Sequence, residues 1–311
     1  MAWACPWPKH RRSPRRDRGQ HGTTRTTPCP GGSVSAATTD GPLILTGLYV
    51  PGNRPERFAK AVASGADLVI LDLEDSVPSA EKVEARLNVV EWLRTKDNDA
   101  ATDRSGPRIQ VRVTAGSDED LDALLPVADR FALRLPKAEN AAQLDSVAGF
   151  SQVTALIETA LGIERAFALA EHPVTAGLAL GDSDLASDLG ASSQQVIDFA
   201  RIRLVVASRA AALPPPMVSA WPGITDLDGL LSDTRRGASM GLIGRVAIHP
   251  VQLPVIRSAF LPNSADISWA SEVIEALLAG GVTTLRSGAM VDAAMRGRAE
   301  RILRLAEATH P

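Results

Sequence analysis

Cysteine, aromatic residues and long apolar runs are all scarce in this sequence. Both cysteines, Cys5 and Cys29, lie within the first forty residues, so the rest of the chain has neither a disulfide framework nor a catalytic thiol. Aromatic residues make up only 4% of the chain although 45% of it is hydrophobic, so its core must consist mainly of Leu, Val, Ile and Ala. No run of eighteen or more apolar residues is present, and no transmembrane helix is therefore expected.

Acidic residues are scarce in the first forty residues and in excess after them. Residues 1–40 contain seven Lys and Arg side chains against Asp17 and Asp40, a balance of +5. Because the whole chain has a net charge of −3, the remainder carries −8. A globular part of that sign gives no reason to expect nucleic-acid binding.

Residues 1–40 are rich in Arg, Pro, Gly, Ser and Thr and lack apolar periodicity, so we expect them to be disordered. A transit peptide has a similar composition, but Pro6, Pro8 and Pro14 would interrupt its amphipathic helix. A basic arm for polyanions is a second alternative, and an extension without function is the one we favour. No apolar segment of a secretory signal is present, and we expect a cytoplasmic protein.

From Pro42 onward, short apolar runs alternate with amphipathic stretches. Eight such units predict a parallel α/β sheet, and eight units that close on themselves form a (β/α)8 TIM barrel. An open doubly wound sheet is the alternative, although no glycine-rich dinucleotide or phosphate loop follows the first run. The expected strands are Leu43–Val50, Asp67–Leu73, Arg108–Val113, Phe131–Pro136, Val153–Glu158, Ala176–Gly181, Met217–Trp221 and Arg245–His249.

Two further helices are expected after the eighth unit, at Ser264–Gly280 and Ala289–Ala308. The predicted organisation is therefore a disordered basic extension (1–40), a TIM barrel (41–262) and a C-terminal helical extension (263–311). Extra helices of this kind often cap a barrel or contact a neighbouring subunit, and we expect the latter here.

Polar side chains collect where the expected strands end. The clearest case is Leu68-Val-Ile-Leu-Asp-Leu-Glu-Asp75, an apolar run typical of a buried strand that ends in Asp72, Glu74 and Asp75. Carboxylates are rarely buried without partners, and ligands bind at this end of parallel strands. The other strand ends contribute Arg54, Arg112, Lys137, Glu139, Glu158, Asp182, Asp184 and His249.

Glu158 and Asp184 belong to adjacent units of the expected barrel. Carboxylate oxygens suit Mg²⁺ or Mn²⁺, and Mg²⁺ usually takes one or two of them together with water and substrate. Arg112 could hold a substrate carboxylate through two hydrogen bonds, and a metal with an arginine would suit a 2-oxo acid. The alternative, equally supported by the pattern, is that Glu158 and Asp184 cap helices or pair with Lys137 and Arg112.

Several motifs, in this order along the chain, resemble the citrate lyase β-subunit-like branch of the HpcH/HpaI aldolase superfamily. The similarity spans roughly residues 43–308. The motifs are Leu48-Tyr-Val-Pro-Gly-Asn-Arg-Pro-Glu-Arg57, Ala66–Val77, Leu135-Pro-Lys137, Ala155-Leu-Ile-Glu-Thr159, Leu180-Gly-Asp-Ser-Asp-Leu-Ala-Ser-Asp-Leu-Gly190 and Ala247-Ile-His-Pro-Val-Gln252.

The resemblance implies a TIM barrel that assembles into trimers or hexamers and binds Mg²⁺. It implies cleavage or formation of a carbon–carbon bond in a CoA thioester such as citryl-, malyl- or citramalyl-CoA, with a CoA-transferase subunit as a further possible partner. The reaction expected is a retro-Claisen cleavage that releases a 2-oxo acid and an acetyl-CoA-type product. Alternatives are malyl-CoA thioesterase or malate synthase-like activity, or a non-catalytic CoA-binding or assembly subunit.

The resemblance also implies roles for individual residues. Glu158 and Asp184 are the expected metal ligands, and Arg112 is expected to bind the substrate carboxylate. The Gly288-Ala-Met-Val-Asp292 segment matches one that serves the neighbouring subunit, which makes Asp292 the expected proton donor. The supporting residues are Glu74 and Asp75, which hold metal-bound water, and Tyr49, Arg54 and Lys60, which contact the CoA-bearing substrate.

Two segments depart from the family pattern. Val111-Arg-Val-Thr114 has Thr where Asn is usual and leads into a shortened loop, and Val218-Ser-Ala-Trp-Pro-Gly-Ile224 lacks two expected acids. Both segments border the substrate, so the acyl group and its carrier are left open. His249 precedes a proline at a strand end, where a hydrogen-bonded structural role is more common than catalysis. Asp72 is interpreted as a structural charge partner.

Overall fold

The computed structural model describes residues 43–95, 106–279, 283–285, 288 and 290–308. The expected basic extension lies outside these residues, and its disorder stays a prediction. All the elements below belong to one compact unit. None of the described helices is both long and apolar enough to cross a membrane.

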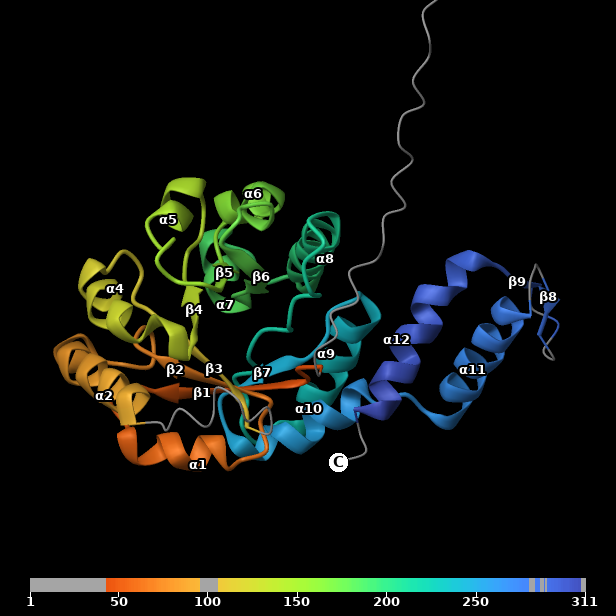
Figure 1. Ribbon diagram of the computed structural model, residues 1–311, viewed down its shortest axis with the longest axis horizontal. Helices are drawn as coiled ribbons and strands as arrows, with labels where there is room; N and C mark the ends of the chain where they lie inside the picture. Colours follow the sequence, from red (N-terminus) through yellow and green to blue (C-terminus); the bar gives the residue numbers. More distant parts are fainter. Residues whose placement is uncertain (1–42, 96–105, 280–282, 286–287, 289, 309–311) are drawn as a thin grey trace, which may run out of the picture. The chain divides into compact units, whose positions relative to one another are not determined.

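Seven parallel strands form a single curled sheet in the order β6-β5-β4-β3-β2-β1-β7 (Figure 1). Each expected strand except the seventh is present, with ends shifted by a few residues. The expected α/β class is confirmed, and the curled sheet is consistent with a TIM-barrel-like fold, but seven of the eight expected strands form and the sheet ends at β6 and β7. The strands are β1 Thr46–Pro51, β2 Leu68–Asp72, β3 Arg108–Arg112, β4 Ala132–Leu135, β5 Val153–Ile157, β6 Thr175–Leu180 and β7 Arg245–Ala247.

The prediction of a strand at Met217–Trp221 is wrong. Only two isolated bridges form there, Met217 with Ala179 of β6 and Val218 with Arg245 of β7. Prolines at 214–216 and 222 enclose this segment, and proline lacks the N–H that a strand ladder requires. The segment nevertheless connects the two outermost strands of the sheet.

Helices cover the outer face of the sheet (Figure 1). Apolar residues of the helices and of the outward strand positions form one continuous core there. Short 3-10 turns occur at Pro55–Arg57, Ser79–Glu81, Leu125–Arg130 and Pro250–Gln252. The covering helices are α1 Phe58–Val62, α2 Lys82–Thr95, α4 Asp118–Leu124, α5 Ala141–Asp145, α6 Ala160–Ala170, α7 Asp182–Asp188, α8 Gln194–Ala210, α9 Leu227–Ser239 and α10 Leu253–Phe260.

The inner face of the sheet changes from apolar to polar along the strands. Alternation places Val69 and Leu71 of β2 in the outer core, so Leu68, Ile70 and Asp72 share the opposite face. Leu68 and Ile70 pack there with Val246, whereas Asp72 pairs in register with Arg112 of β3. The interior is therefore apolar at one end and charged at the carboxyl ends of the strands.

A C-terminal segment adds helices α11 Ser264–Leu278 and α12 Arg296–Glu307, with the strand pair β8 Thr283–Thr284 and β9 Met290–Val291 between them. Ala270, Val273, Val291 and Ala299 belong to a small separate core in this segment. Two helices were expected, but the second begins at Arg296 rather than 289. Residues 290 and 291 pair with β8, and Asp292 then starts a 3-10 turn at Ala293–Met295.

Candidate active site

A cavity of about 330 Å³ opens at the carboxyl ends of the strands. Its walls come from strands distant in sequence, which the curled sheet brings together. One part is charged, and another is formed by Leu156, Leu180, Ala220, Val246 and Ile248. The polar lining residues include Tyr49, Asp72, Asp75, Ser76, Arg112, Arg134, Glu158, Asp182, Ser183, Asp184 and Ser219.

Asp72 and Arg112 form a buried two-pronged ion pair at the centre of this end. Arg112 Nε and Nη2 each donate to one oxygen of Asp72, both at 2.7 Å. Asp72 also accepts hydrogen bonds from the backbone N–H groups of Glu74 and Ser76. Burial raises the pKa of Asp72, but Arg112 and the hydrogen bonds from Ser76 and Glu74 together outweigh it, so the pKa lies below its ordinary value. The structure gives Asp72 the charge-pairing role predicted for it.

Glu74 and Asp75 approach the same guanidinium. Arg112 Nη1 donates to Asp75 Oδ2 at 2.8 Å and lies 3.2 Å from Glu74 Oε2, which is buried and accepts no hydrogen bond from the described residues. Burial raises the pKa of Glu74 to about 7, against the lowering effect of Arg112. Thr114, at the first departure from the family pattern, donates from Oγ1 to the carbonyl of Leu73 at 2.9 Å and fastens this loop to the end of β3.

Glu158 and Asp184 lie on neighbouring parts of the cavity wall. Glu158 Oε1 accepts the backbone N–H of Lys137 at 2.9 Å, and Lys137 Nζ donates to Asp184 Oδ1 at 3.2 Å. Lys137 adopts a positive φ of 47°, which few residues other than glycine tolerate. Burial and the charge of Asp184 raise the pKa of Glu158 to about 7, while the hydrogen bond from Lys137 lowers it.

This arrangement fits a magnesium ion. Asp184 is partly exposed to the cavity, and Glu158 Oε2 lies only 2.5 Å from the position that a Cβ on Gly181 would occupy. Glycine at 181 thus leaves the second Glu158 oxygen its space. No cluster of three or more His, Cys, Asp or Glu residues suited to a metal occurs in the described part of the chain. Two carboxylates with water and substrate are the ligand set typical of Mg²⁺.

Of the other expected site residues, one lies in the cavity and three lie outside its described wall. Tyr49 lies in the cavity, with its ring centroid 4.8 Å from the Arg112 guanidinium carbon. Arg54, Lys60 and Asp292 are exposed, and the cavity wall described above does not include them. Asp292 Oδ1 accepts the backbone N–H of Ala294 and so caps a 3-10 turn.

His249 has the structural role expected of it, because its Nδ1 accepts the backbone N–H of Val251 at 3.2 Å. It caps the turn that follows β7.

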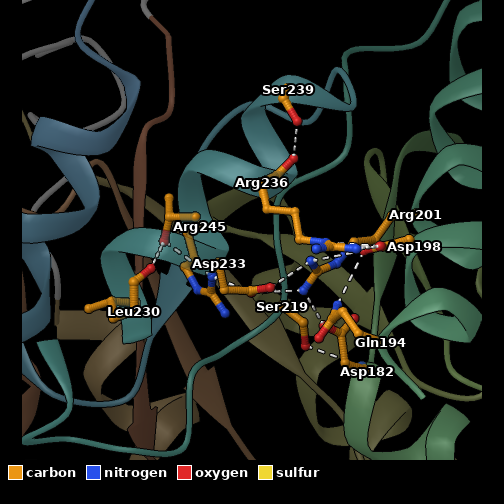
Figure 2. Close-up of polar contacts among 11 residues, drawn as sticks. Asp182, Gln194, Asp198, Arg201, Ser219, Leu230, Asp233, Arg236, Ser239 and Arg245 are labelled. Carbon is orange, nitrogen blue, oxygen red and sulfur yellow. Dashed lines mark hydrogen bonds and ion pairs between the residues drawn. The ribbon is translucent and has the colours of Figure 1, made fainter. Parts of the chain in front are cut away.

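A buried ion-pair network supports the first turn of α7, the helix that carries Asp184 (Figure 2). Arg201 of α8 donates to Asp182 Oδ2 at 2.7 Å and to both oxygens of Asp233 at 2.9 Å. Arg245 of β7 donates to Asp233 at 2.8 Å. The backbone N–H of Asp182 donates to Ser219 Oγ at 3.2 Å. The segment 218–224, which differs from the family pattern, therefore also contacts the start of α7. The network fixes the first turn of α7 to α8, α9 and β7.

Sequence reasoning missed Arg134, which lies on β4 and lines the cavity. The available signal was a single charged residue within the apolar run Ala132-Leu-Arg-Leu135. Its direction, toward the interior rather than toward the helices, follows only from the register of β3 with β4, which pairs Arg112 with Arg134.

The model of the HpcH/HpaI aldolase/citrate lyase family matches residues 45–250, which include every strand of the sheet. The chain belongs to this family. A citrate lyase subunit beta-like protein of Mycobacterium tuberculosis is 38% identical over 270 residues, which cover 84% of this chain and 96% of the relative.

Relatives with other activities are also similar. A (3S)-malyl-CoA thioesterase of Cereibacter sphaeroides is 32% identical and covers 74% of this chain and 81% of the relative. The mitochondrial citramalyl-CoA lyase of Homo sapiens is 30% identical and covers 83% and 84%. The crystal structure of CitE from M. tuberculosis with magnesium, acetoacetate and coenzyme A has a TM-score of 0.73 and 34% identity, and covers 85% of this chain and 98% of that one.

Proposed function

We propose that this protein is a Mg²⁺-dependent carbon–carbon lyase that cleaves a 3-hydroxyacyl-CoA thioester into an acetyl-CoA-type product and a 2-oxo acid. The observation that carries the proposal is the position of Glu158 and Asp184 on one cavity wall, beside an arginine-rich strand layer. Family membership, and relatives named as a citramalyl-CoA lyase and a citrate lyase β-like protein, support it.

In this proposal, Glu158 and Asp184 hold Mg²⁺, which supplies Lewis-acid stabilisation of negative charge on the substrate oxygens. Arg112 was expected to bind the substrate carboxylate. Because all three of its guanidinium nitrogens donate to Asp72 or Asp75, we propose instead that it holds these acidic residues in place at the cavity wall. Lys137 contributes a second cation beside Asp184, and although burial lowers its pKa, the contact with Asp184 raises it overall. The ammonium group therefore stays charged at neutral pH.

The proposed reaction begins with loss of the proton from the substrate hydroxyl through a water molecule to the carboxylate of Glu74 or Asp75, which becomes protonated. The electron pair on that oxygen forms the carbonyl of the 2-oxo acid as the carbon–carbon bond breaks. The electrons of the broken bond pass to the thioester fragment as an enolate. Glu74 suits the acid–base step because burial raises its pKa to about 7. A general base is most effective when its pKa lies near the pH at which the enzyme operates.

Protonation of the enolate carbon completes the reaction, and Asp292 is the proposed donor. Asp292 is exposed in the single chain and belongs to the segment between α11 and α12. We propose that it serves the cavity of a neighbouring subunit, where it would donate the proton as a general acid. This step requires a homo-oligomer, for which a trimer or hexamer is proposed. Arg54 and Lys60, both exposed, are assigned to the CoA part of the substrate.

Hydrolysis of malyl-CoA is the second candidate function, supported by the similarity to the C. sphaeroides thioesterase. The two reactions differ in what they release. A lyase yields a 2-oxo acid with the thioester intact, whereas a thioesterase yields a free thiol without a 2-oxo acid.

The deciding experiment incubates the full chain and Mg²⁺ with citryl-, malyl- and citramalyl-CoA and measures 2-oxo acid and free thiol separately. Glu158→Gln should abolish Mg²⁺-dependent turnover, and Glu164→Gln, on the exposed face of α6, should leave it unchanged. Turnover that survives Glu158→Gln would contradict the metal assignment. If wild-type protein releases neither product from any of the three thioesters, a non-catalytic CoA-binding or assembly subunit becomes the better explanation.

A further inference from the structure

Arg134 is a buried guanidinium with an incomplete set of partners. Its residue is 3% exposed, and Nε donates to Gln110 Oε1 at 2.9 Å. Gln110 Nε2 in turn donates to Thr154 Oγ1 at 3.0 Å, which fixes the amide so that its oxygen faces Arg134. Within the described part of the chain, Arg134 has no carboxylate partner, and its two terminal nitrogens have no hydrogen bond.

The adjacent Arg112 is in the opposite situation. The two arginines are paired in register on β3 and β4, and both guanidinium groups lie over the ring of Tyr49, at 4.8 and 5.9 Å. All three guanidinium nitrogens of Arg112 donate to Asp72 or Asp75. Arg112 is therefore neutralised by the protein itself, whereas Arg134 is not.

A buried cation without a carboxylate is unfavourable unless something else compensates its charge. One neutral amide and one aromatic face compensate only part of the lost hydration. Both terminal nitrogens of Arg134 retain some exposed surface, and the residue lines the cavity. These donors are therefore open to the cavity. The fork of N–H groups thus faces the cavity where a planar anion can accept two hydrogen bonds.

We propose that Arg134 binds a second carboxylate of the substrate and so selects thioesters that release a 2-oxo dicarboxylic acid. The preferred substrate would carry a carboxymethyl arm, in place of a methyl group or hydrogen, on the carbon that bears the hydroxyl. This inference rests on the proposed function for the reaction but not for the anion site. A carboxylate is favoured over a CoA phosphate because Arg134 lies on the inner face of the strand, in the layer of Arg112 and Asp72.

Binding of the product acids tests the site without turnover. Freshly prepared oxaloacetate and pyruvate, which differ by one carboxylate, are titrated by calorimetry into the full chain with and without Mg²⁺. We expect wild-type protein to bind oxaloacetate about ten- to a hundredfold more tightly, the range of a hydrogen bond to a charged group. Arg134→Met should remove that preference while it changes the affinity for pyruvate less than about twofold.

Three controls accompany this test. Arg134→Lys keeps a positive charge and should retain part of the preference, which also covers the possibility that the methionine variant does not fold. Arg209→Met removes an exposed charge from α8 and should change neither affinity. Free CoA titrated into wild type and Arg134→Met should bind equally. An effect of Arg134→Met on CoA alone would identify the anion as a phosphate and overturn the carboxylate assignment.

Two other results would overturn the proposal: equal affinity of wild-type protein for the two acids, or the same loss for both acids in Arg134→Met. Turnover gives an independent reading, because the ratio of kcat/KM for citryl-CoA over citramalyl-CoA should fall at least about tenfold in Arg134→Met. If wild-type protein cleaves none of citryl-, malyl- and citramalyl-CoA, the proposed lyase function fails, while the binding ratio still decides the role of Arg134.

Discussion

Replacement of Asp72 by asparagine should destabilise the protein far more than the same change at Asp75. Both carboxylates bind Arg112, at 2.7 and 2.8 Å, but the side chain of Asp72 is 1% exposed and that of Asp75 is 59% exposed. Removing one member of a buried pair leaves its partner uncompensated, at a cost of about 3–5 kcal/mol. An exposed pair contributes at most about 1 kcal/mol.

The contacts explain why asparagine cannot substitute at position 72. Each Asp72 oxygen accepts one hydrogen bond from Arg112 and one from a backbone N–H. An amide retains one acceptor oxygen, and its NH₂ group would then face two donors. Arg112 would keep Asp75 and Glu74 but lose the bond pair that fixes its plane.

The assay is urea unfolding at pH 7, followed by far-ultraviolet circular dichroism, on wild-type protein, Asp72→Asn and Asp75→Asn. The double variant Asp72→Asn/Arg112→Met removes both charges and should recover part of the loss seen in Asp72→Asn. The reasoning is refuted if Asp72→Asn and Asp75→Asn lose similar free energy of unfolding, or if the double variant is no more stable than Asp72→Asn.

Three further outcomes are expected. Burial raises the pKa of Glu74 from 4.5 to about 7, so the folded state binds more protons than the unfolded state between these pH values, and wild-type stability should fall as pH rises from 5 to 7. Glu74→Gln should make the melting temperature depend less on pH in this range, and an unchanged slope would contradict the assignment. Gly181→Ala should displace the Glu158 carboxylate and weaken Mg²⁺ binding, measured by calorimetry, at least about tenfold, and wild-type affinity would exclude the crowding argument. Asp292→Asn should stop turnover yet leave Mg²⁺ affinity and melting temperature unchanged; wild-type rates would reject its acid role.

The sheet was predictable because most strand positions are buried, so that the strands appear as short, largely apolar runs between amphipathic stretches. Periodicity could not show that residues 217–221 form bridges instead of a strand, since their apolar content matches a strand and only the surrounding prolines oppose it. The turn before α12 was missed for a similar reason. Pairing of Met290–Val291 with β8 is a non-local contact that no local propensity encodes.

The candidate site was predictable to the extent that strand ends of a parallel barrel must meet. Glu158, Asp184 and Arg112 were assigned to that end and do line one cavity. The sequence did not show which charged residues pair with one another, because pairing depends on the strand register and on the face of the sheet that each residue occupies. Arg112 was expected to be free for substrate, yet it is held by three acidic residues. Arg134, which the sequence did not single out, is buried and has no carboxylate partner in the described part of the chain.

The charges around the cavity are separated in a way that would orient a substrate. On the β5 and β6 side, Glu158 and Asp184 have one ion-pair partner among the described residues, Lys137, so the three groups carry a net charge of −1. A divalent cation would change this to +1, which a carboxylate of the bound substrate would offset. On the β4 side, Arg134 is the unbalanced group, and a carboxylate would neutralise it. Between these two sides lies the Asp72–Arg112 ion pair, in which each charge is already compensated by the other. A substrate with a chelating 2-hydroxy acid group and a second carboxylate satisfies both sides at once, whereas one with a methyl group leaves Arg134 buried and uncompensated.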